Sequence, residues 1–104
     1  MPLDEKGSIL QDVKIYLGIT WDSDDEKISG ILKRGAARLE SIAGVPLNFE
    51  EEALPRDLLF DFCRYGNSQA LEMFEKNFSA ELTRLYLCGR IEEAEHANQN
   101  TDPV

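Results

Sequence analysis

The chain has 104 residues, of which 42% are hydrophobic, so it is long enough for one domain with a buried core and too short for two. Twenty acidic residues against eleven basic ones give a formal net charge of -9, which repels phosphate and argues against general nucleic-acid binding. No apolar run approaches the roughly 18 residues that a membrane-spanning helix needs, so we expect no membrane contact.

The first predicted helix begins at Ser8 and ends before Gly18. Ser8 and Gln11 have the form of a capping box, and glycine is typical of the position that follows the last helical turn. Between them lies an apolar face formed by Ile9, Leu10, Val13, Tyr16 and Leu17. Ile19 to Trp21 form a short apolar link, in which we expect Trp21 to belong to the core, with a partner contact as the alternative.

The second predicted helix lies within residues 22–44. Ser23 and Glu26 form a predicted capping box, and the acids of this run lie at the positive end of the helix dipole. The 3.6-residue period is carried by Ile28, Ile31, Leu32, Gly35, Ala36, Leu39, Ile42 and Ala43. Gly44 ends the helix, and Gly35 on its apolar face predicts a close crossing by another helix.

The acidic run that starts at Asp22 invites comparison with a calcium-binding loop. Such a loop needs a glycine at its sixth position and a glutamate at its twelfth, and those positions are Lys27 and Lys33 here. The spacing therefore excludes a calcium loop, and helix capping accounts for the acids.

Residues 45–53 read as a loop that is pinned by Leu47 and Phe49. A third helix is predicted from Pro55, which suits a first turn, to Tyr65, before the sequence Gly66–Asn67–Ser68 interrupts it.

The last predicted helix extends from Gln69 to Cys88 and is ended by Gly89. Residues 77–79 are able to interrupt it, but the apolar spacing continues through them without a change of phase. We expect the core stripes of the last two helices to be Leu54, Leu58, Leu59, Phe62 and Cys63, followed by Leu71, Phe74, Phe78, Leu82 and Leu85. Cys63 and Cys88 both stand among apolar residues and form no CxxC pair, so we expect buried, reduced thiols.

These patterns predict an all-α protein, a small bundle of about four helices with a polar C-terminal tail. Residues 1–89 form the helical domain, and residues 90–104 have too little apolar surface to fold alone. We expect this tail to be disordered until it docks on a partner through Ile91, Ala94 and Ala97. His96 is expected to be exposed and without a role.

No arrangement of residues typical of catalysis is present. A nucleophile beside a base, a glycine-rich phosphate loop and a cysteine–histidine metal set are all absent from the pattern, so we predict a protein that is not an enzyme and has no cofactor. We accordingly assign no catalytic, cofactor-binding or metal-binding residue. Arg64 and Tyr65 form a basic and aromatic pair, for which a structural salt bridge or an interface contact is favoured over base stacking.

An ordered set of residues carries a family resemblance. It comprises Asp12, Val13, Lys14, Tyr16, Leu17, Gly18 and Ile19, an acidic cap before a long helix, Leu58, Leu59, Cys63, Arg64 and Tyr65, then Ala70, Leu71, Phe74, Phe78 and Leu82. Over residues 11–87 this pattern, which is mostly hydrophobic spacing, resembles the phage head-tail connector family. Its members are the adaptor or head completion proteins of tailed phages and prophages.

The resemblance implies a virion protein at the head-tail junction, made in the cytoplasm of the host bacterium. Its implied partners are the portal protein, a neck or tail completion protein, and further copies of itself in a ring that is usually a dodecamer. DNA passes through the lumen of such a ring without specific binding. The family has no catalytic residues, so none is transferred.

The residues that we expect at an interface are Trp21, Arg34, Arg38, Phe49, Arg64, Tyr65, Arg90, Ile91, Ala94 and Ala97. An alternative function fits the charge equally well. An acidic helical interaction module, such as an inhibitor or regulator that imitates DNA, would bind a basic partner without assembling with itself.

Overall fold

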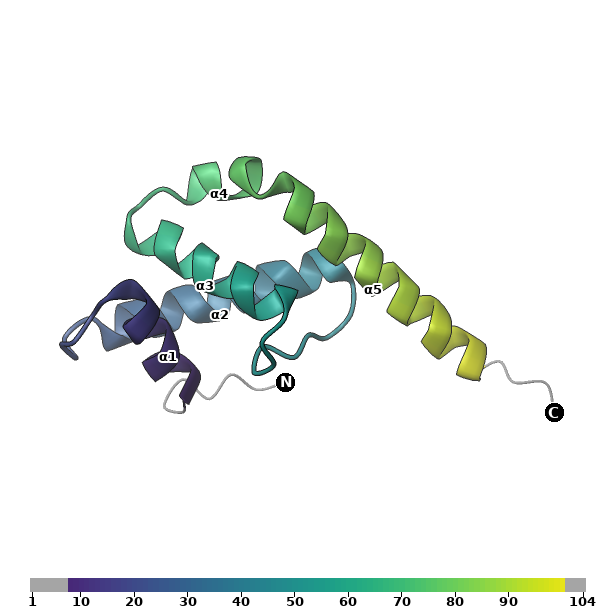
Figure 1. Ribbon diagram of the computed structural model, residues 1–104, viewed down its shortest axis with the longest axis horizontal. Helices are drawn as coiled ribbons and strands as arrows, with labels where there is room; N and C mark the ends of the chain where they lie inside the picture. The colour runs from purple at the N-terminus through teal and green to yellow at the C-terminus, as the bar shows by residue number, and fades with distance from the viewer. Residues whose placement is uncertain (1–7, 101–104) are drawn as a thin grey trace.

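The computed structural model describes the backbone of residues 8–100 and the side chains of residues 9–92. The helices in the described backbone are α1 (Ser8–Leu17), α2 (Asp25–Ala43), α3 (Leu54–Asn67), α4 (Leu71–Asn77) and α5 (Ser79–Asn100), and no strand is present there (Figure 1). The all-α prediction is confirmed. There are five helices in this part of the chain, one more than expected, because the last predicted helix is divided in two.

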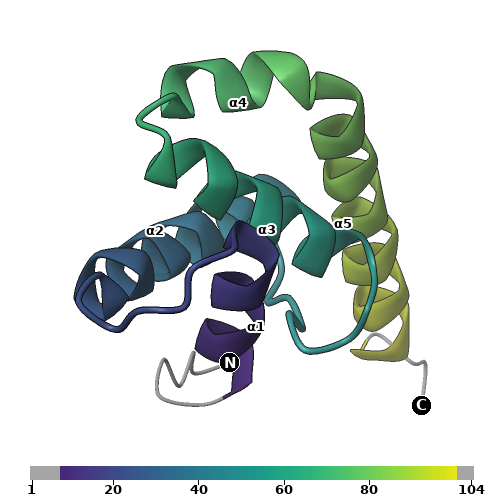
Figure 2. The same cartoon turned by 60° about the vertical axis from the view of Figure 1, so that its left-hand side comes forward.

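The centre of the molecule is the crossing of α2 and α3 (Figures 1 and 2). At Gly35 in α2, an added Cβ would lie 2.7 Å from Phe62 Cδ1 and 2.9 Å from Leu59 Cδ1 of α3. A side chain there would force the two helices apart, so the predicted close crossing at Gly35 is confirmed. Helix α1 packs across one end of this pair, and α4 and α5 pack against its other sides.

The core contains the expected apolar stripes. Its most deeply buried members are Val13, Ile28, Leu32, Leu39, Phe49, Leu58, Leu59, Cys63, Phe74 and Leu85. Leu54, Leu71 and Phe78 are partly buried and pack against these residues, whereas Phe62 and Leu82 are buried. The stripes predicted for the last two helices are therefore confirmed, whereas Tyr16 of the predicted first apolar face is 49% exposed.

The end of α1 and both ends of α2 test the predicted capping residues. Gly18 and Gly44 have φ angles of 76° and 77°, the left-handed conformation that ends a helix, so both predicted ends are confirmed. At the start of α2, however, Asp24 is the N-cap residue, and its side chain makes no capping hydrogen bond. The predicted Ser23 capping box is therefore wrong. Two neighbouring carboxylates, those of Asp22 and Asp25, bind Lys14.

The loop at residues 45–53 is tied to the helices at several points. Glu40 Oε2 accepts a hydrogen bond of 2.9 Å from the Leu47 amide, and Arg56 Nη1 donates one of 3.1 Å to the Phe49 carbonyl. The Phe49 side chain is 1% exposed and belongs to the core. The loop is therefore pinned by Phe49 as predicted, with Leu47 partly buried beside it.

A break at Phe78 divides the last predicted helix into α4 and α5. Phe78 has φ -114° and ψ 26°, outside the helical region, yet its ring stacks on Phe74 at 5.1 Å between centroids. The apolar spacing continues through the break because Phe78 still packs toward the core. The expectation of one continuous helix is wrong, because the backbone leaves the helical conformation at Phe78.

Helix α5 does not end at Gly89, which is a second difference from the prediction. It continues to Asn100, while Gly89 is buried against the end of α2. A Cβ at Gly89 would lie 2.8 Å from the carbonyl carbon of Ala43, and closer still to its oxygen. Gly89 therefore permits a close contact between two helices and does not act as a helix terminator.

The molecule is elongated because α5 extends beyond the rest of the fold (Figure 1). Its radius of gyration is 15.3 Å, compared with about 13 Å for a compact chain of this length. The principal extents are 57, 29 and 19 Å, with α1 toward one end of the long axis and the C-terminal part of α5 at the other.

Candidate protein interface

The acids that precede α2 bind the side chain of Lys14. Its ammonium nitrogen lies 2.7 Å from Asp22 Oδ1 and 2.8 Å from Asp25 Oδ1, the latter as an ion pair without hydrogen-bond geometry. The Lys14 side chain is 4% exposed and the paired Asp25 oxygen is buried, whereas the Asp22 side chain is 86% exposed, so the ion pairs lie at the edge of the core. The hydrogen bond to Asp22, and then the close carboxylate of Asp25, raise the pKa of Lys14. This segment thus fastens α1 to α2, while Asp25 and Glu26 also lie in the first turn of α2, at the positive end of its dipole as predicted.

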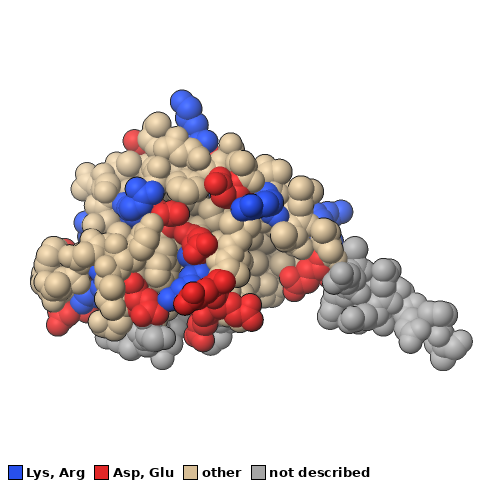
Figure 3. Space-filling model, viewed as in Figure 1, with Lys and Arg blue, Asp and Glu red and all other residues tan. Residues whose placement is uncertain are grey.

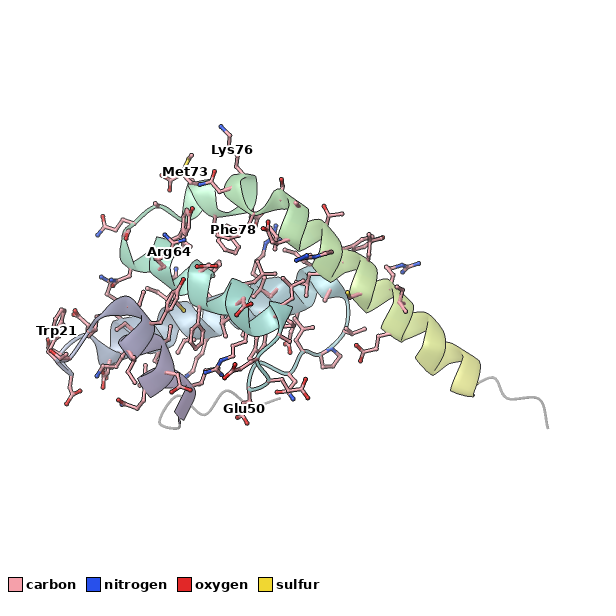
Figure 4. The ribbon with its side chains drawn as sticks, viewed as in Figure 1. Trp21, Glu50, Arg64, Met73, Lys76 and Phe78 are labelled. Carbon is pink, nitrogen blue, oxygen red and sulfur yellow. The ribbon has the colours of Figure 1, made fainter. Side chains whose placement is uncertain are left out.

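Trp21 lies on the surface, at the end of the molecule opposite the C-terminal part of α5 (Figure 4). Its side chain is 51% exposed, and its indole nitrogen donates a hydrogen bond of 2.9 Å to Asp24 Oδ2. The expectation that Trp21 belongs to the core is wrong, because the link turns Ile19 inward in its place. An exposed tryptophan is available for a partner contact.

A shallow hollow of about 390 Å³ lies where α1, the 45–53 loop and α3 meet. We call it the acidic groove, and its lining residues are Tyr16, Glu52, Arg56, Asp57, Phe60 and Asp61. Figure 3 shows carboxylates gathered on the lower middle part of this face of the molecule.

Hydrogen bonds and ring contacts hold the walls of the acidic groove. The Tyr16 hydroxyl donates a hydrogen bond of 2.6 Å to Asp61 Oδ1, which raises the pKa of Tyr16. Arg56 donates to Asp12 Oδ2 at 2.7 Å, and its guanidinium lies 4.6 Å from the centre of the Phe60 ring. The positive charge of Arg56 is therefore already offset by a carboxylate.

Arg64 and Tyr65 have mainly structural contacts. Arg64 Nε lies 3.4 Å from Asp61 Oδ1, and its guanidinium lies 4.9 Å from the centre of the Tyr65 ring. Tyr65 is partly buried, packs edge-on against Phe78 at 5.6 Å, and accepts a hydrogen bond of 3.0 Å from Asn77 Nδ2. These contacts favour a structural role for Arg64 and Tyr65, although Arg64 is also exposed.

Arg38 joins α2 to α4 through a bidentate ion pair. Its Nε and Nη2 lie 2.7 and 3.0 Å from the two carboxylate oxygens of Glu75. The hydrogen bond from Arg38 lowers the pKa of Glu75. Arg34, one turn earlier in α2, is exposed and makes no ion pair or hydrogen bond with any side chain in the described part of the chain. Of these two expected interface residues, only Arg34 is free to engage a partner.

Phe49 is not an interface residue. Its ring is 1% exposed, so it cannot reach another molecule without unfolding of the loop.

The prediction that both cysteines are buried is confirmed for Cys63 and wrong for Cys88. Cys63 is fully buried, which raises the pKa of its thiol to about 12, whereas Cys88 is exposed on α5.

Helix α5 carries large apolar side chains that the described residues leave half exposed or more. Leu87 is 51% exposed and Ile91 is 60% exposed, and both lie on the side of α5 that carries Arg84. We call Arg84, Leu87 and Ile91 the outer stripe of α5. Arg90 is exposed nearby. The expected contacts of Ala94 and Ala97, and the expected exposure of His96, lie outside the residues whose side chains are described.

Sequence reasoning missed several exposed apolar residues, namely Ile15, Tyr16, Met73, Tyr86 and Leu87. For Leu87 a signal was available. It stands four residues before Ile91, and it lies on the opposite side of a helix from Leu82 and Leu85. A second apolar stripe of this kind indicates either deeper burial or a partner surface.

No family model matches this sequence, and neither a curated protein nor a solved structure is similar to it. Within the described residues, no group of three histidine, cysteine or acidic side chains is placed to hold a metal ion. None of the helices there is both long and apolar enough to cross a membrane.

Proposed function

We propose that this chain is a structural adaptor of a tailed-phage virion. It assembles into a ring beneath the portal, joins the head to the neck or tail completion protein, and lets DNA pass through the lumen. It is made in the cytoplasm of the host bacterium and ends at the head-tail junction of the virion. The family resemblance over residues 11–87 suggests this function, and the exposed surfaces of the fold support it.

The observation that carries the proposal is the uncovered part of α5. Among the described side chains, Gly89 is the last buried residue of this helix, yet the helix continues to Asn100. Leu87 and Ile91 are more than half exposed at this point. A small domain that holds a long helix with exposed apolar side chains beyond its own core presents a docking element for another protein.

A ring also needs two different contact surfaces on each subunit. Trp21 is exposed toward one end of the long axis, and α5 extends toward the other (Figures 1 and 4). Surfaces that differ and lie apart favour a heterologous contact, which closes into a ring when the rotation between neighbours permits. With a charge of -9 on each subunit, the ring repels phosphate within a Debye length of about 8 Å, and DNA passes without adhering.

The alternative function, a DNA-imitating inhibitor, requires a continuous acidic surface. On the face shown in Figure 3, basic side chains lie among the acidic ones. The Arg38–Glu75 and Arg64–Asp61 pairs are examples of charges that neutralise each other on the surface. This mixture favours the adaptor over the DNA mimic.

The proposal is tested by mixing the purified protein with portal rings and separating the complexes by sedimentation. We expect cosedimentation with the portal and, in electron micrographs, an additional ring of about the portal's own symmetry. A basic nucleic-acid-binding protein serves as the comparison partner. Binding to that protein, with no association with the portal or with itself, would instead support the inhibitor.

A further inference from the structure

Helix α5 has two apolar sides, and the fold covers only one of them. Leu82, Leu85 and Gly89 face the core. At about 100° per residue, the outer stripe lies on the opposite side of the helix from these residues. A helix with apolar side chains on its solvent side is an unpartnered face, because its exposed aliphatic area gains free energy only when another surface covers it.

The outer stripe also carries a positive charge. Arg84 is exposed, stands one turn before Leu87, and makes no hydrogen bond or ion pair with the described residues. The surface that fits this stripe therefore needs apolar area for Leu87 and Ile91, together with an acceptor for a guanidinium group.

The acidic groove supplies both properties. Glu52 and Asp57 are exposed carboxylates on its rim, and the rings of Tyr16 and Phe60 pack together at 5.6 Å. A guanidinium binds carboxylates in pairs of hydrogen bonds and also stacks on aromatic rings, so it suits this lining better than an ammonium does. The groove's own arginine is bound by Asp12 and lies over the Phe60 ring, so the rim carboxylates are the acceptors left for an incoming guanidinium.

We propose that the outer stripe of α5 in one copy docks in the acidic groove of a second copy. Figures 1 and 2 place α5 and α1 in different parts of the molecule, so the helix does not cover the groove of its own chain. The two surfaces are different, so the contact is heterologous and leaves one free surface on each partner. That such contacts close into a ring rests on the proposed function. The contact itself is inferred from the charges and apolar residues of this chain.

This contact is small. Three side chains with their neighbours supply less than the roughly 800 Å² per partner of a stable interface. A single pair is therefore weak, and closure of the ring strengthens assembly because the copy that closes it makes two contacts at once.

Two complementary variants test the contact. The stripe variant carries Arg84→Glu and Leu87→Asp, and keeps an intact groove. The groove variant carries Glu52→Gln and Asp57→Asn, which leave no charge to attract the stripe variant's new acids, and keeps an intact stripe. We expect each to remain monomeric in sedimentation equilibrium, whereas their mixture forms a one-to-one dimer that cannot grow, at least about tenfold tighter than either self-association.

Lys76→Glu is the control, because it makes the same charge change as Arg84→Glu at an exposed residue of α4 outside both surfaces. It should self-associate like the natural protein. All four positions are exposed, and melting curves verify that each variant is folded. A second measurement uses Cys88, which is exposed beside the stripe: in Asp57→Cys, oxidation should join neighbouring copies, and additional Cys88→Ser should abolish this cross-link.

The contact would be overturned by a natural protein that stays monomeric up to about 1 mM, or by variants that self-associate alone and fail to form the mixed dimer. Self-association and portal binding without the mixed dimer would place the contact elsewhere and leave the adaptor function standing. A mixed dimer without any portal binding would support the contact and contradict the adaptor function.

Discussion

At the scale of single residues, Lys14 shows how a charged side chain is used inside a helical core. Its side chain is buried almost completely, and its ammonium binds the carboxylates of Asp22 and Asp25. The pairing fixes the link between the two helices without burying an isolated charge. The free energy of this arrangement depends on the protonation of Lys14, which makes it measurable through pH.

The predicted variant is Lys14→Met, which keeps the length of the stem and removes the ammonium. The pKa of Lys14 in the folded protein is raised above 10.5, so its stabilisation is complete below the unfolded value and is lost as the pH rises through the folded value. We expect the natural protein to melt at a higher temperature than the variant near neutral pH, and the difference to shrink as the pH rises beyond 10.5 and through the raised pKa of Lys14. Taking the difference at each pH cancels the ionisation of the tyrosines. A difference that persists at high pH would mean that the ammonium contributes nothing.

Phe74 is the residue whose loss should cost most in the aromatic cluster. It is 1% exposed and contacts the rings of Phe62, Tyr65 and Phe78. Phe74→Ala should lower the free energy of unfolding by about 3 to 5 kcal/mol in urea denaturation. Met73 is the neighbouring control and is 39% exposed. Met73→Ala should change the free energy of unfolding by less than about 1 kcal/mol. Equal losses for the two variants would show that Phe74 is not a core residue.

At the scale of the elements, glycines in the helices decide how closely the helices pack. Gly35 admits Phe62 and Leu59 of α3, Gly66 admits Ile31 of α2, and Gly89 admits the backbone at the end of α2. In each case the helix forgoes the better helix propensity of alanine to allow the contact. Gly30 is different, since nothing lies within 4 Å of a Cβ added there.

This difference predicts opposite results for the same substitution. Gly89→Ala should destabilise the protein, because the new Cβ meets the Ala43 backbone, which cannot move aside as a flexible side chain does. Gly30→Ala should stabilise it by about 0.5 to 1 kcal/mol, because only propensity changes at that exposed position in α2. Urea denaturation of the two variants checks the prediction. A stabilising Gly89→Ala would mean that α5 does not approach α2 at this point.

At the scale of the whole molecule, the separation of the core from the C-terminal part of α5 suggests separate roles in folding and docking. Deleting residues 93–104 removes nothing from the core described here, and it leaves Ile91 and the outer stripe in place. We expect the free energy of unfolding to change by no more than about 1 kcal/mol, while binding to portal rings falls at least about tenfold.

Melting curves and portal cosedimentation of the truncated protein measure the two effects, with self-association as the control that should be unchanged. Undiminished portal binding after the deletion would place the docking surface elsewhere. The loop at residues 45–53 is then the next candidate, because its three exposed glutamates stand beside the acidic groove.

The sequence by itself determined the fold class, most of the core and several helix ends. Apolar residues that recur every three to four positions leave no arrangement for Leu58, Leu59, Phe74 and Leu85 other than burial on one side of a helix. Gly18 ended its helix as predicted because its left-handed backbone angle is a local property of the chain. Short-range rules are sufficient where neighbouring residues alone fix the conformation.

Only the tertiary structure decided the features that depend on residues distant in sequence. Gly89, like Gly18, is a glycine that follows an apolar helical stripe. Ala43 of α2 nevertheless lies against it, and the helix continues. Lys14 binds Asp22 and Asp25, which belong to the acidic run that was expected to cap α2. The candidate interface changed for the same reason, since burial removes Phe49 from it and exposure adds Leu87. Packing free energy between separate helices exceeds the small local preferences in these places, and no pattern within one helix records it.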